Sequence, residues 1–571
     1  MRAILTRLAG ATAAALAAVA LYILFTTPPA ALDLEGAVPD HVALGAYHVH
    51  SSRSDGTGSV ARIASAAASA GLAFVILTDH GDATRAPDPS AYVDGVLVID
   101  AVEVGTDRGH LVALGLREAS PYPLAGHPRE VVEDVHRLGG MAVISHPDSP
   151  NAGLRWRGTG VGFDGIEWLN ADSEWRDERP WTLGATALRS LVRPAESVAS
   201  LFSRPDRSLQ RWDQALRTRQ VVGLAAADAH GGVIAGRDEG EGRVAILRVP
   251  SYRAMFLAMA QAVTLARPLS GDAADDAARV LDALRAGRTW SIVRALAGPA
   301  HLEFVAVDAA GVETPMGASV PDLVGSRAEL RARVPQAPGA RITLHHRGQV
   351  VATGQGSLTH GAPAPPGAYR VEVSLPGTEV PWIVSNPIYL GRAAGGEDER
   401  VRAGPAAGAG EVVPLPADDR WVVEEDASSD GTVTVDDGAV VFAYRLGGGP
   451  PSGQYAALVA PVGHGTGYDR LRFTISAEAP MRVSVQMRLP GGRDGLRWRR
   501  SVYVDRQPHT VVVRLEDLEP VGGASSQRPL VAPIQSVLFV VDTVNTLPGA
   551  SGTFRVSGVG LGVGDLGDAG R

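Results

Sequence analysis

Two residue types are missing from this chain of 571 amino acids: it contains no cysteine, and all 53 of its basic residues are arginine. Without cysteine, disulfides and thiolate metal sites are excluded. Without lysine, the chain cannot form a Walker A phosphate loop, a lysine Schiff base or a carbamylated-lysine bridge between metals. A metal site must therefore use imidazole and oxygen ligands, and cationic recognition of phosphate must use arginine.

Composition limits the class of protein. The hydrophobic content of 45% with 20% charged residues is typical of a folded chain. Because single cores rarely exceed about 300 residues, we expect two or three domains. The net charge of -9 argues against a surface that coats nucleic acid, and no specific nucleic-acid partner is predicted.

The N-terminus carries a long uncharged stretch. Residues 8–32 follow two arginines and exceed the length of about 20 residues that crosses a bilayer. Residues 1–35 are therefore predicted to be a membrane anchor or a signal peptide. Pro28 and Pro29 make the nearby cleavage site poor, which favours the anchor. The rest of the chain is then expected outside the cytoplasmic membrane, tethered by this segment, or secreted if the segment is cleaved.

Residues 40–298 alternate short apolar runs with helical patterns. Helices are expected at 59–71, where Ser59 can cap the start, and at 128–140. This alternation predicts a parallel α/β sheet or barrel. The apolar runs, interpreted as buried parallel strands, are 74–78, 96–100, 141–145, 165–169, 221–227 and 243–249.

The pattern changes after residue 298. Residues 299–392 show alternating strands with proline and glycine turns, which predicts a small β-sandwich. Residues 393–411 are rich in glycine, alanine and charge without periodicity, as in a flexible linker. A second series of strands over 412–565 predicts an independent β-sandwich.

Ionisable residues recur where the predicted strands of the α/β region end. His48 and His50 are two apart, a spacing that sends both side chains to one side of a strand, and Asp228 and His230 repeat it. Catalytic groups gather at this rim in parallel α/β barrels, so a metal site is predicted. Ligands without sulfur suit zinc, manganese or iron, and so many require two or three divalent ions. The candidates are His48, His50, Asp55, His80, Glu103, His146, Asp228 and His230.

These residues lie in motifs that resemble the PHP family, named for polymerase and histidinol phosphatase. The motifs are "HVHSSRSDG", "LTDH", "EVG", "GHLVALG", "ISHP" and "DAH", within residues 44–295. The resemblance implies a distorted seven-stranded (β/α) barrel with a trinuclear metal centre that hydrolyses phosphoesters, followed here by two all-β sandwich domains. It assigns one metal to His48, His50, Glu103 and Asp228, a second to Asp55, His80 and His230, and a third to Glu103, His110 and His146.

Other residues are candidates for supporting roles. Arg53 is the first candidate for binding substrate phosphate, with Arg85 and Arg108 behind it, although each can equally be a solvated surface arginine. Asp79 is expected to orient a metal-bound imidazole. Glu167 and Asn170 resemble a strand ending of the PHP family and could shape the pocket, and residues 171–220 are interpreted as a helical insertion.

The predicted function is a metal-dependent phosphoesterase that attacks a phosphomonoester or phosphodiester, in a small molecule or a polymer, with a metal-bridging hydroxide. An amidohydrolase-type enzyme is a second hypothesis. A non-enzymatic envelope or glycan-binding protein, with the barrel as a scaffold, is a third. The last β-domain weakly resembles galactose-binding-like jelly rolls, so a glycan is a candidate partner. Trp421 and Trp498 could stack on sugars or fill a core.

Overall fold

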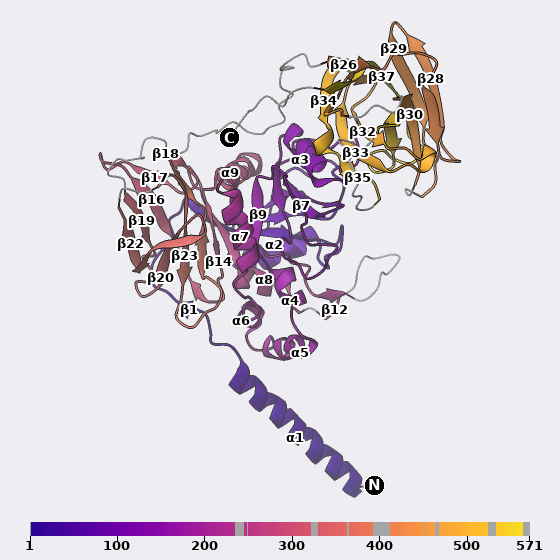
Figure 1. Cartoon of the computed structure of the whole chain (residues 1–571). Coiled ribbons are helices and arrows are strands. Elements are labelled where there is room, and N and C mark those ends of the chain that lie inside the picture. Colours follow the sequence, from indigo (N-terminus) through magenta and orange to yellow (C-terminus); the bar gives the residue numbers. More distant parts are fainter. Residues whose placement is uncertain are drawn as a thin grey trace. The chain divides into compact units, whose positions relative to one another are not determined.

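The computed structural model describes residues 2–234, 245–247, 249–320, 329–361, 365–391, 411–450, 453–462, 467–522 and 533–563. The chain divides into two compact units (Figure 1). The predicted linker, 393–411, lies outside the described residues except for Glu411. The first unit comprises Met1–Asp82, Ala86–Glu118 and Val135–Asp398, and the second comprises Ala83–Arg85, Ala119–Asp134 and Glu399–Arg571.

The first unit begins with a long apolar helix, α1 (Arg2–Thr26). Its segment Ile4–Thr26 has a mean hydropathy of 2.2, and by length and composition it could cross a membrane. At about 1.5 Å per residue, its 25 residues exceed the roughly 30 Å of a hydrocarbon core. The expected apolar helix is present, and its role as anchor or signal stays a prediction.

Two sheets form the α/β part of the first unit. Their strands are β2 (Val42–Val49), β3 (Phe74–Leu77), β4 (Ala91–Val93), β5 (Val96–Asp100), β6 (Val102–Thr106), β7 (Gly109–Leu114), β8 (Met141–Ile144), β9 (Gly165–Asn170), β10 (Val222–Ala226), β13 (Ala260–Thr264) and β14 (Thr289–Ile292). One sheet has the order β10-β9-β8-β7-β6, and the other follows the path β14-β13-β2-β3-β5-β4. Two isolated parallel bridges, Val49↔Ala229 and His80↔Glu103, join the sheets.

The direction of the strands is mixed. β2, β3 and β5 pair in parallel, as do β8, β9 and β10, so five of the six apolar runs have parallel neighbours as predicted. The run at 243–249 was wrongly assigned, because β12 (Ala245–Leu247) pairs antiparallel with β11 (Val233–Ile234). A short apolar run has no periodicity that distinguishes a buried parallel strand from one arm of a hairpin. The mixed α/β class is confirmed.

Helices alternate with these strands. Ser59 caps α2 by accepting a hydrogen bond from the backbone N–H of Arg62 at 3.4 Å, as predicted. A run of four helices separates β9 from β10, which corresponds to the insertion expected over 171–220. The helices are α2 (Val60–Ser69), α3 (Pro128–Arg137), α4 (Ala171–Arg176), α5 (Pro180–Arg189), α6 (Pro194–Ala199), α7 (Asp206–Ala215), α8 (Tyr252–Ala258) and α9 (Ala273–Arg285).

Mostly antiparallel strands complete the first unit. β24 pairs with β14, so one hydrogen-bonded sheet continues from the α/β part into these strands. Trp382 and Tyr369 are buried in their core, as the β-sandwich prediction requires. The strands are β1 (Leu32–Asp33), β15 (Ala297–Gly298), β16 (Glu303–Val307), β17 (Glu313–Pro315), β18 (Ser319–Val320), β19 (Glu329–Arg333), β20 (Arg341–His346), β21 (Gln349–Gln355), β22 (Ser357–His360), β23 (Gly367–Ser374), β24 (Ile383–Ser385) and β25 (Ile388–Leu390).

The second unit is built around a β-sandwich of two six-stranded sheets. Trp421 and Trp498 are buried in its core, so both side chains pack inside the sandwich. The strands are β26 (Glu411–Pro414), β27 (Val422–Glu425), β28 (Asp430–Asp436), β29 (Ala439–Arg445), β30 (Tyr455–Pro461), β31 (Arg470–Ala477), β32 (Met481–Arg488), β33 (Arg497–Val504), β34 (His509–Arg514), β35 (Glu519–Pro520), β36 (Ser536–Asp542) and β37 (Ser551–Val563).

Within the second unit, a buried arginine binds the segment Ala119–Asp134. Arg482 of β32 donates to the Asp134 carboxylate at 2.7 Å and to the backbone oxygen of Glu130 at 2.8 Å. Its guanidinium also lies 3.2 Å from the Glu133 carboxylate. A buried charge is tolerated only when it is paired in this way.

We therefore expect Asp134→Ala to lower the free energy of unfolding of the second unit by about 3–5 kcal/mol, because it leaves Arg482 buried with a weaker partner set. The measurement is urea denaturation of the full chain, followed through near-ultraviolet circular dichroism. Asp430→Ala is the control, since Asp430 pairs with Arg445 on the surface, and it should cost less than about 1 kcal/mol. Equal effects of the two substitutions would contradict this prediction.

Candidate metal centre

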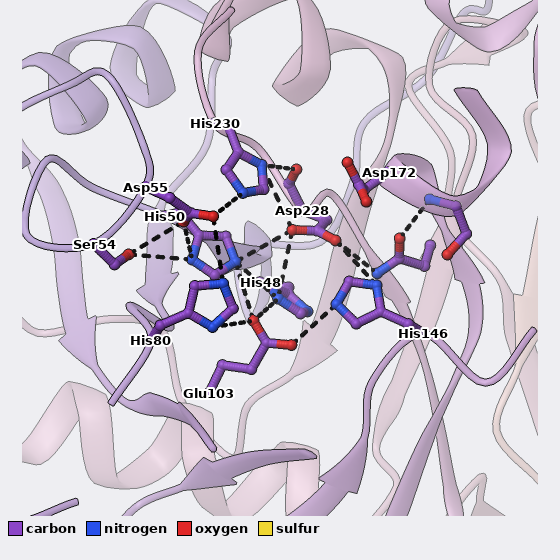
Figure 2. Close-up of polar contacts among 12 residues, drawn as sticks. His48, His50, Ser54, Asp55, His80, Glu103, His146, Asp172, Asp228 and His230 are labelled. Atoms are coloured by element: carbon purple, nitrogen blue, oxygen red, sulfur yellow. Dashed lines mark hydrogen bonds and ion pairs between the residues drawn. The ribbon is translucent and has the colours of Figure 1, made fainter. Parts of the chain in front are cut away.

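The nine predicted metal ligands come together in the first unit. Figure 2 shows imidazole rings and carboxylates from distant parts of the chain pointing toward Glu103 and Asp228. Five triads of these residues offer ligand atoms that lie within 4.8 Å of one another. The nine residues are His48, His50, Asp55, His80, Glu103, His110, His146, Asp228 and His230.

Glu103 is fully buried at the centre of the cluster. Its Oε2 faces three histidines and its Oε1 faces two more, so a single carboxylate contacts five imidazole rings. Such a position suits a ligand that bridges two ions. The nitrogen–oxygen distances are 3.2 Å to His48 Nε2, 3.3 Å to His50 Nε2, 3.3 Å to His80 Nδ1, 3.1 Å to His110 Nδ1 and 3.0 Å to His146 Nε2.

Asp228 is the second buried carboxylate of the cluster. Its Oδ1 lies 3.2 Å from His50 Nε2 and 3.5 Å from His48 Nε2, and its Oδ2 lies 3.4 Å from His146 Nδ1. Asp228 and Glu103 therefore both approach the Nε2 atoms of His48 and His50. These contacts agree with the first ligand set that the family resemblance implies.

Asp55 joins the more exposed side of the cluster. Its Oδ2 lies 3.4 Å from His80 Nε2 and 3.3 Å from His230 Nε2, and its Oδ1 lies 3.3 Å from His50 Nδ1. The second implied ligand set, Asp55, His80 and His230, is thus assembled around one carboxylate. The members of this set are partly exposed, so solvent reaches this side of the cluster.

Irregular backbone helps three of the ligands to reach the centre. His48, His146 and Asp228 have φ angles of 62°, 48° and 44°, the left-handed region that non-glycine residues rarely adopt. The pairing of β2 with β3 also shifts register between Ala46 and Val49. His48 and His50 do converge, but not through the regular alternation that the spacing suggested. Strain of this kind costs about 1–3 kcal/mol per residue and is concentrated at functional sites.

His110 reaches the cluster through the β6–β7 hairpin. Glu103 pairs with Val112 across the hairpin, which places His110, two residues earlier, on the same face of the sheet as Glu103. The third implied ligand set therefore has a simple structural basis. Sequence spacing alone left His110 as the least secure ligand, because it lies in an antiparallel strand and not at the end of a parallel one.

Buried neighbours fix the orientation of the ligands. Glu167 lies 2.5 Å from His48 Nδ1, and it accepts hydrogen bonds from the backbone of His146 at 3.0 Å and from the Asn170 side chain at 2.8 Å. Asn170 also donates to Asp228 at 3.1 Å. Such partners direct the other imidazole nitrogen, here His48 Nε2, toward the centre.

Asp79 supports the loop that follows β2. It accepts hydrogen bonds from the backbone and side chain of Ser51, at 2.8 and 2.6 Å, and from the Ser54 hydroxyl at 2.6 Å. Asp79 was expected to orient a metal-bound imidazole, whereas its hydrogen bonds are to Ser51 and Ser54. It holds the loop that carries Asp55.

The charges of the cluster shift the pKa values of its members. Burial alone would lower the pKa of His50, but hydrogen bonds and charge from Asp228 and Glu103 outweigh it and raise the value to about 10. In the same way, burial is outweighed at His146, whose pKa is raised to about 9 by Asp228 and Glu103. Burial would raise the pKa of Glu103, yet the surrounding histidines hold it well below its usual range.

The cluster fits divalent cations. His48 Nε2 and His50 Nε2 face each other at 3.1 Å beside two carboxylates. Among the described residues, the buried atoms Asp228 Oδ1 and His146 Nδ1 have charged neighbours at 3.2 and 3.4 Å but make no well-aligned hydrogen bond. Buried polar atoms without well-aligned hydrogen bonds are costly, and converging imidazole nitrogens and carboxylate oxygens are what zinc, manganese and iron bind.

The three arginines that were predicted to bind phosphate have different surroundings. The guanidinium of Arg53 donates to Asp100 at 3.1 Å and pairs with Asp88. The Arg108 side chain lies 4.0 Å from Asp107. Arg85 belongs to the segment Ala83–Arg85, which is part of the second unit. Arg53 thus has its planar fork engaged by carboxylates.

Arg176, at the end of α4, is a cation that the sequence did not single out. It pairs with the buried Asp172, and its guanidinium lies 4.8 Å from the Trp175 ring centroid. Burial would lower its pKa, but Asp172, Asp228 and Asp55 raise it, so Arg176 lies in the electric field of the cluster. The sequence feature that could have identified Arg176 is its position six residues after Asn170, at the end of the short helix α4.

Comparisons with known proteins leave the family open. No family model matches the chain. An uncharacterized protein of Methanocaldococcus jannaschii is 32% identical over 104 residues, which cover 18% of this chain, and the chain thus spans 60% of that protein's length.

Solved carbohydrate-binding modules resemble only a part of the chain. A family 11 module from a cellulosomal cellulase of Clostridium thermocellum is 15% identical, covering 28% of this chain and 97% of that one, with a TM-score of 0.22. A CBM4 structure is 20% identical, covering 25% and 93%, with a TM-score of 0.18. TM-scores this low assign neither a fold nor a ligand.

The raised pKa values predict how the metal-free protein responds to pH. Histidines that titrate at 6.5 when unfolded and at about 9 to 10 when folded stabilise the fold fully below pH 6.5 and lose that contribution as pH rises. We expect the urea midpoint of chelator-treated protein to fall as pH rises from 6.5 to about 10. The metal-loaded protein should show a smaller fall, because the ligands are deprotonated throughout. Equal slopes for the two forms would contradict this.

Proposed function

We propose that this chain is a metal-dependent phosphoesterase of the PHP type, which hydrolyses a phosphomonoester or phosphodiester outside the cytoplasmic membrane. The observation that carries the proposal is the convergence of nine nitrogen and oxygen ligands around Glu103 and Asp228. The bridges Val49↔Ala229 and His80↔Glu103, which join both sheets, support a strand arrangement closed into a distorted seven-stranded (β/α) barrel.

Two or three divalent ions would be held by three overlapping ligand groups. The first is centred on His48 and His50, the second on Asp55, and the third on Glu103 with His110 and His146. When bound, such ions lower the pKa of water and neutralise the charge on phosphoryl oxygens. Zinc, manganese and iron all suit this donor set.

The protein's own residues would orient the ligands and the substrate. Glu167 holds His48 in one orientation and, through Asn170, positions Asp228. Arg176 would bind a nonbridging phosphoryl oxygen, since a planar guanidinium matches phosphate and Asp172 holds its position. Arg176 replaces Arg53 as the first candidate for this role, because two carboxylates engage the Arg53 guanidinium and only Asp172 is seen to pair with Arg176 among the described residues.

The other two functions make different demands. An amidohydrolase is disfavoured by the absence of lysine, which removes one common metal bridge. An envelope protein that uses the α/β part as a scaffold has no need for strained ligand residues such as His146 and Asp228. A glycan partner stays a prediction, and the burial of Trp421 and Trp498 means that other side chains would have to bind the sugar.

His50→Ala tests the phosphoesterase directly. Because His50 contacts Glu103, Asp228 and Asp55, its loss should remove bound metal and lower turnover of aryl phosphate esters by more than about 100-fold. Elemental analysis and initial rates on mono- and diesters are the measurements. His509→Ala is the control, since His509 lies on the surface of the second unit beside Asp505.

The alternatives give distinct outcomes. Turnover of amides but not of phosphoesters would favour the amidohydrolase. Metal binding without any turnover would favour the scaffold. Unchanged phosphoester turnover in His50→Ala, with its circular dichroism spectrum intact, would refute the assigned centre.

Arg176→Ala tests substrate binding. It should lower kcat/KM for phosphoesters by about 10- to 100-fold, the loss of a charge-assisted hydrogen bond, while the metal content stays unchanged. Arg176→Lys should recover part of the loss, because it keeps the charge but not the fork. Arg445→Ala, an exposed arginine of the second unit, serves as the control. An unaltered kcat/KM in Arg176→Ala would exclude this role.

A further inference from the structure

The insertion between β9 and β10 exposes apolar side chains on one side of a helix. Trp181 in α5 is 67% exposed, and beyond the end of the helix Leu191 is 73% and Val192 is 60% exposed. Leu188 is exposed as well. The spacing of seven residues from Trp181 to Leu188 and three from Leu188 to Leu191 places them on one face.

The backbone continues the helical turn past α5. The N–H of Leu191 donates to the oxygen of Leu188 at 3.2 Å, and that of Val192 donates to Arg189 at 3.0 Å. The opposite side of the helix faces the protein, since Thr186 is buried. Single exposed apolar residues are common on protein surfaces, whereas several on one helical face mark an interaction surface.

The helix that carries this face, α5, contacts the apolar helix α1, and both belong to the first unit. Five residues past the end of α1, the backbone N–H of Ala31 donates to Glu196 of α6 at 3.4 Å. The segment of chain that leaves the candidate membrane span is therefore attached to the same insertion that exposes the apolar face. No membrane-spanning helix other than α1 is found among the described residues.

One arginine lies against the apolar side chains. The Arg179 guanidinium lies 5.1 Å from the centroid of the Trp181 ring. At the far end of the helix, Arg189 donates to Thr186 on the buried side, and Arg193 pairs with Glu196. Tryptophan prefers the boundary between hydrocarbon and water, and arginine can keep its charge among lipid headgroups while its stem packs on apolar surface. An apolar face bordered by arginine is a feature of helices that lie in the membrane interface.

We propose that the surface formed by Trp181, Leu188, Leu191 and Val192 lies in the headgroup layer of the membrane that α1 enters. Its occupant is a lipid surface, with anionic headgroups near Arg179. The proposal is independent of the chemistry at the metal centre. It makes α5 a second point of membrane contact, in addition to the N-terminal helix.

Tryptophan fluorescence of the full chain in vesicles tests this proposal. α1 contains no tryptophan, so quenching by lipids with brominated acyl chains reports on the rest of the protein. In vesicles of phosphatidylethanolamine and phosphatidylglycerol, brominated lipid should lower the emission of the wild type. Trp181→Phe should lose most of that quenching, and Trp175→Phe, a matched change in the neighbouring helix α4, should keep it.

Alkaline extraction of the same vesicles reports on α1 separately. Quenching that depends on Trp181 supports the proposal whether or not the chain resists extraction. Quenching that is absent in the wild type, or equal in the wild type and Trp181→Phe, overturns it. A self-associating surface would give that negative result, together with a concentration-dependent mass in detergent that Leu191→Asn abolishes.

Discussion

The candidate site depends on mutual compensation among ionisable groups that the fold has removed from water. Glu103, Glu167 and Asp228 are buried. Burial of a charged carboxylate without a partner is unfavourable in free energy by more than the packing of one side chain can offset. The histidines around them supply that partner, and they would themselves resist protonation without the carboxylates. Neither set is stable there alone, so the ligands have to converge as a group.

This compensation accounts for the irregular backbone of the ligands. Left-handed φ angles at His48, His146 and Asp228 are unfavourable, and the surrounding sheets must hold each residue there. Glu167 contributes by binding the ring of His48 and the backbone of His146 together. The geometry of the candidate centre is thus set by packed strands and buried hydrogen bonds.

Much of this could be predicted from sequence, and the failures have physical causes. The convergence of the candidate ligands could be predicted because chemistry-bearing residues follow strands that are buried and hence strongly apolar, as at His80 after β3 and His146 after β8. Short apolar runs do not show whether a strand pairs in parallel or antiparallel. The β6–β7 hairpin that carries His110 and the pairing of β12 could therefore not be predicted. The contact of Arg176 with Asp172 and the burial of Trp421 depend on tertiary packing, which cannot be predicted from composition.

The two units are interleaved along the chain. Ala119–Asp134 belongs to the second unit, yet it lies in sequence between strands of the first, β7 and β8. A chain cut at residue 398 would keep Glu133 and Asp134 but lose Arg482, the cation that pairs with both carboxylates. Deleting the C-terminal sandwich would therefore leave the carboxylates of the segment Ala119–Asp134 without their buried cation. The sandwich is thus not an independent module that can be removed without affecting the rest of the protein.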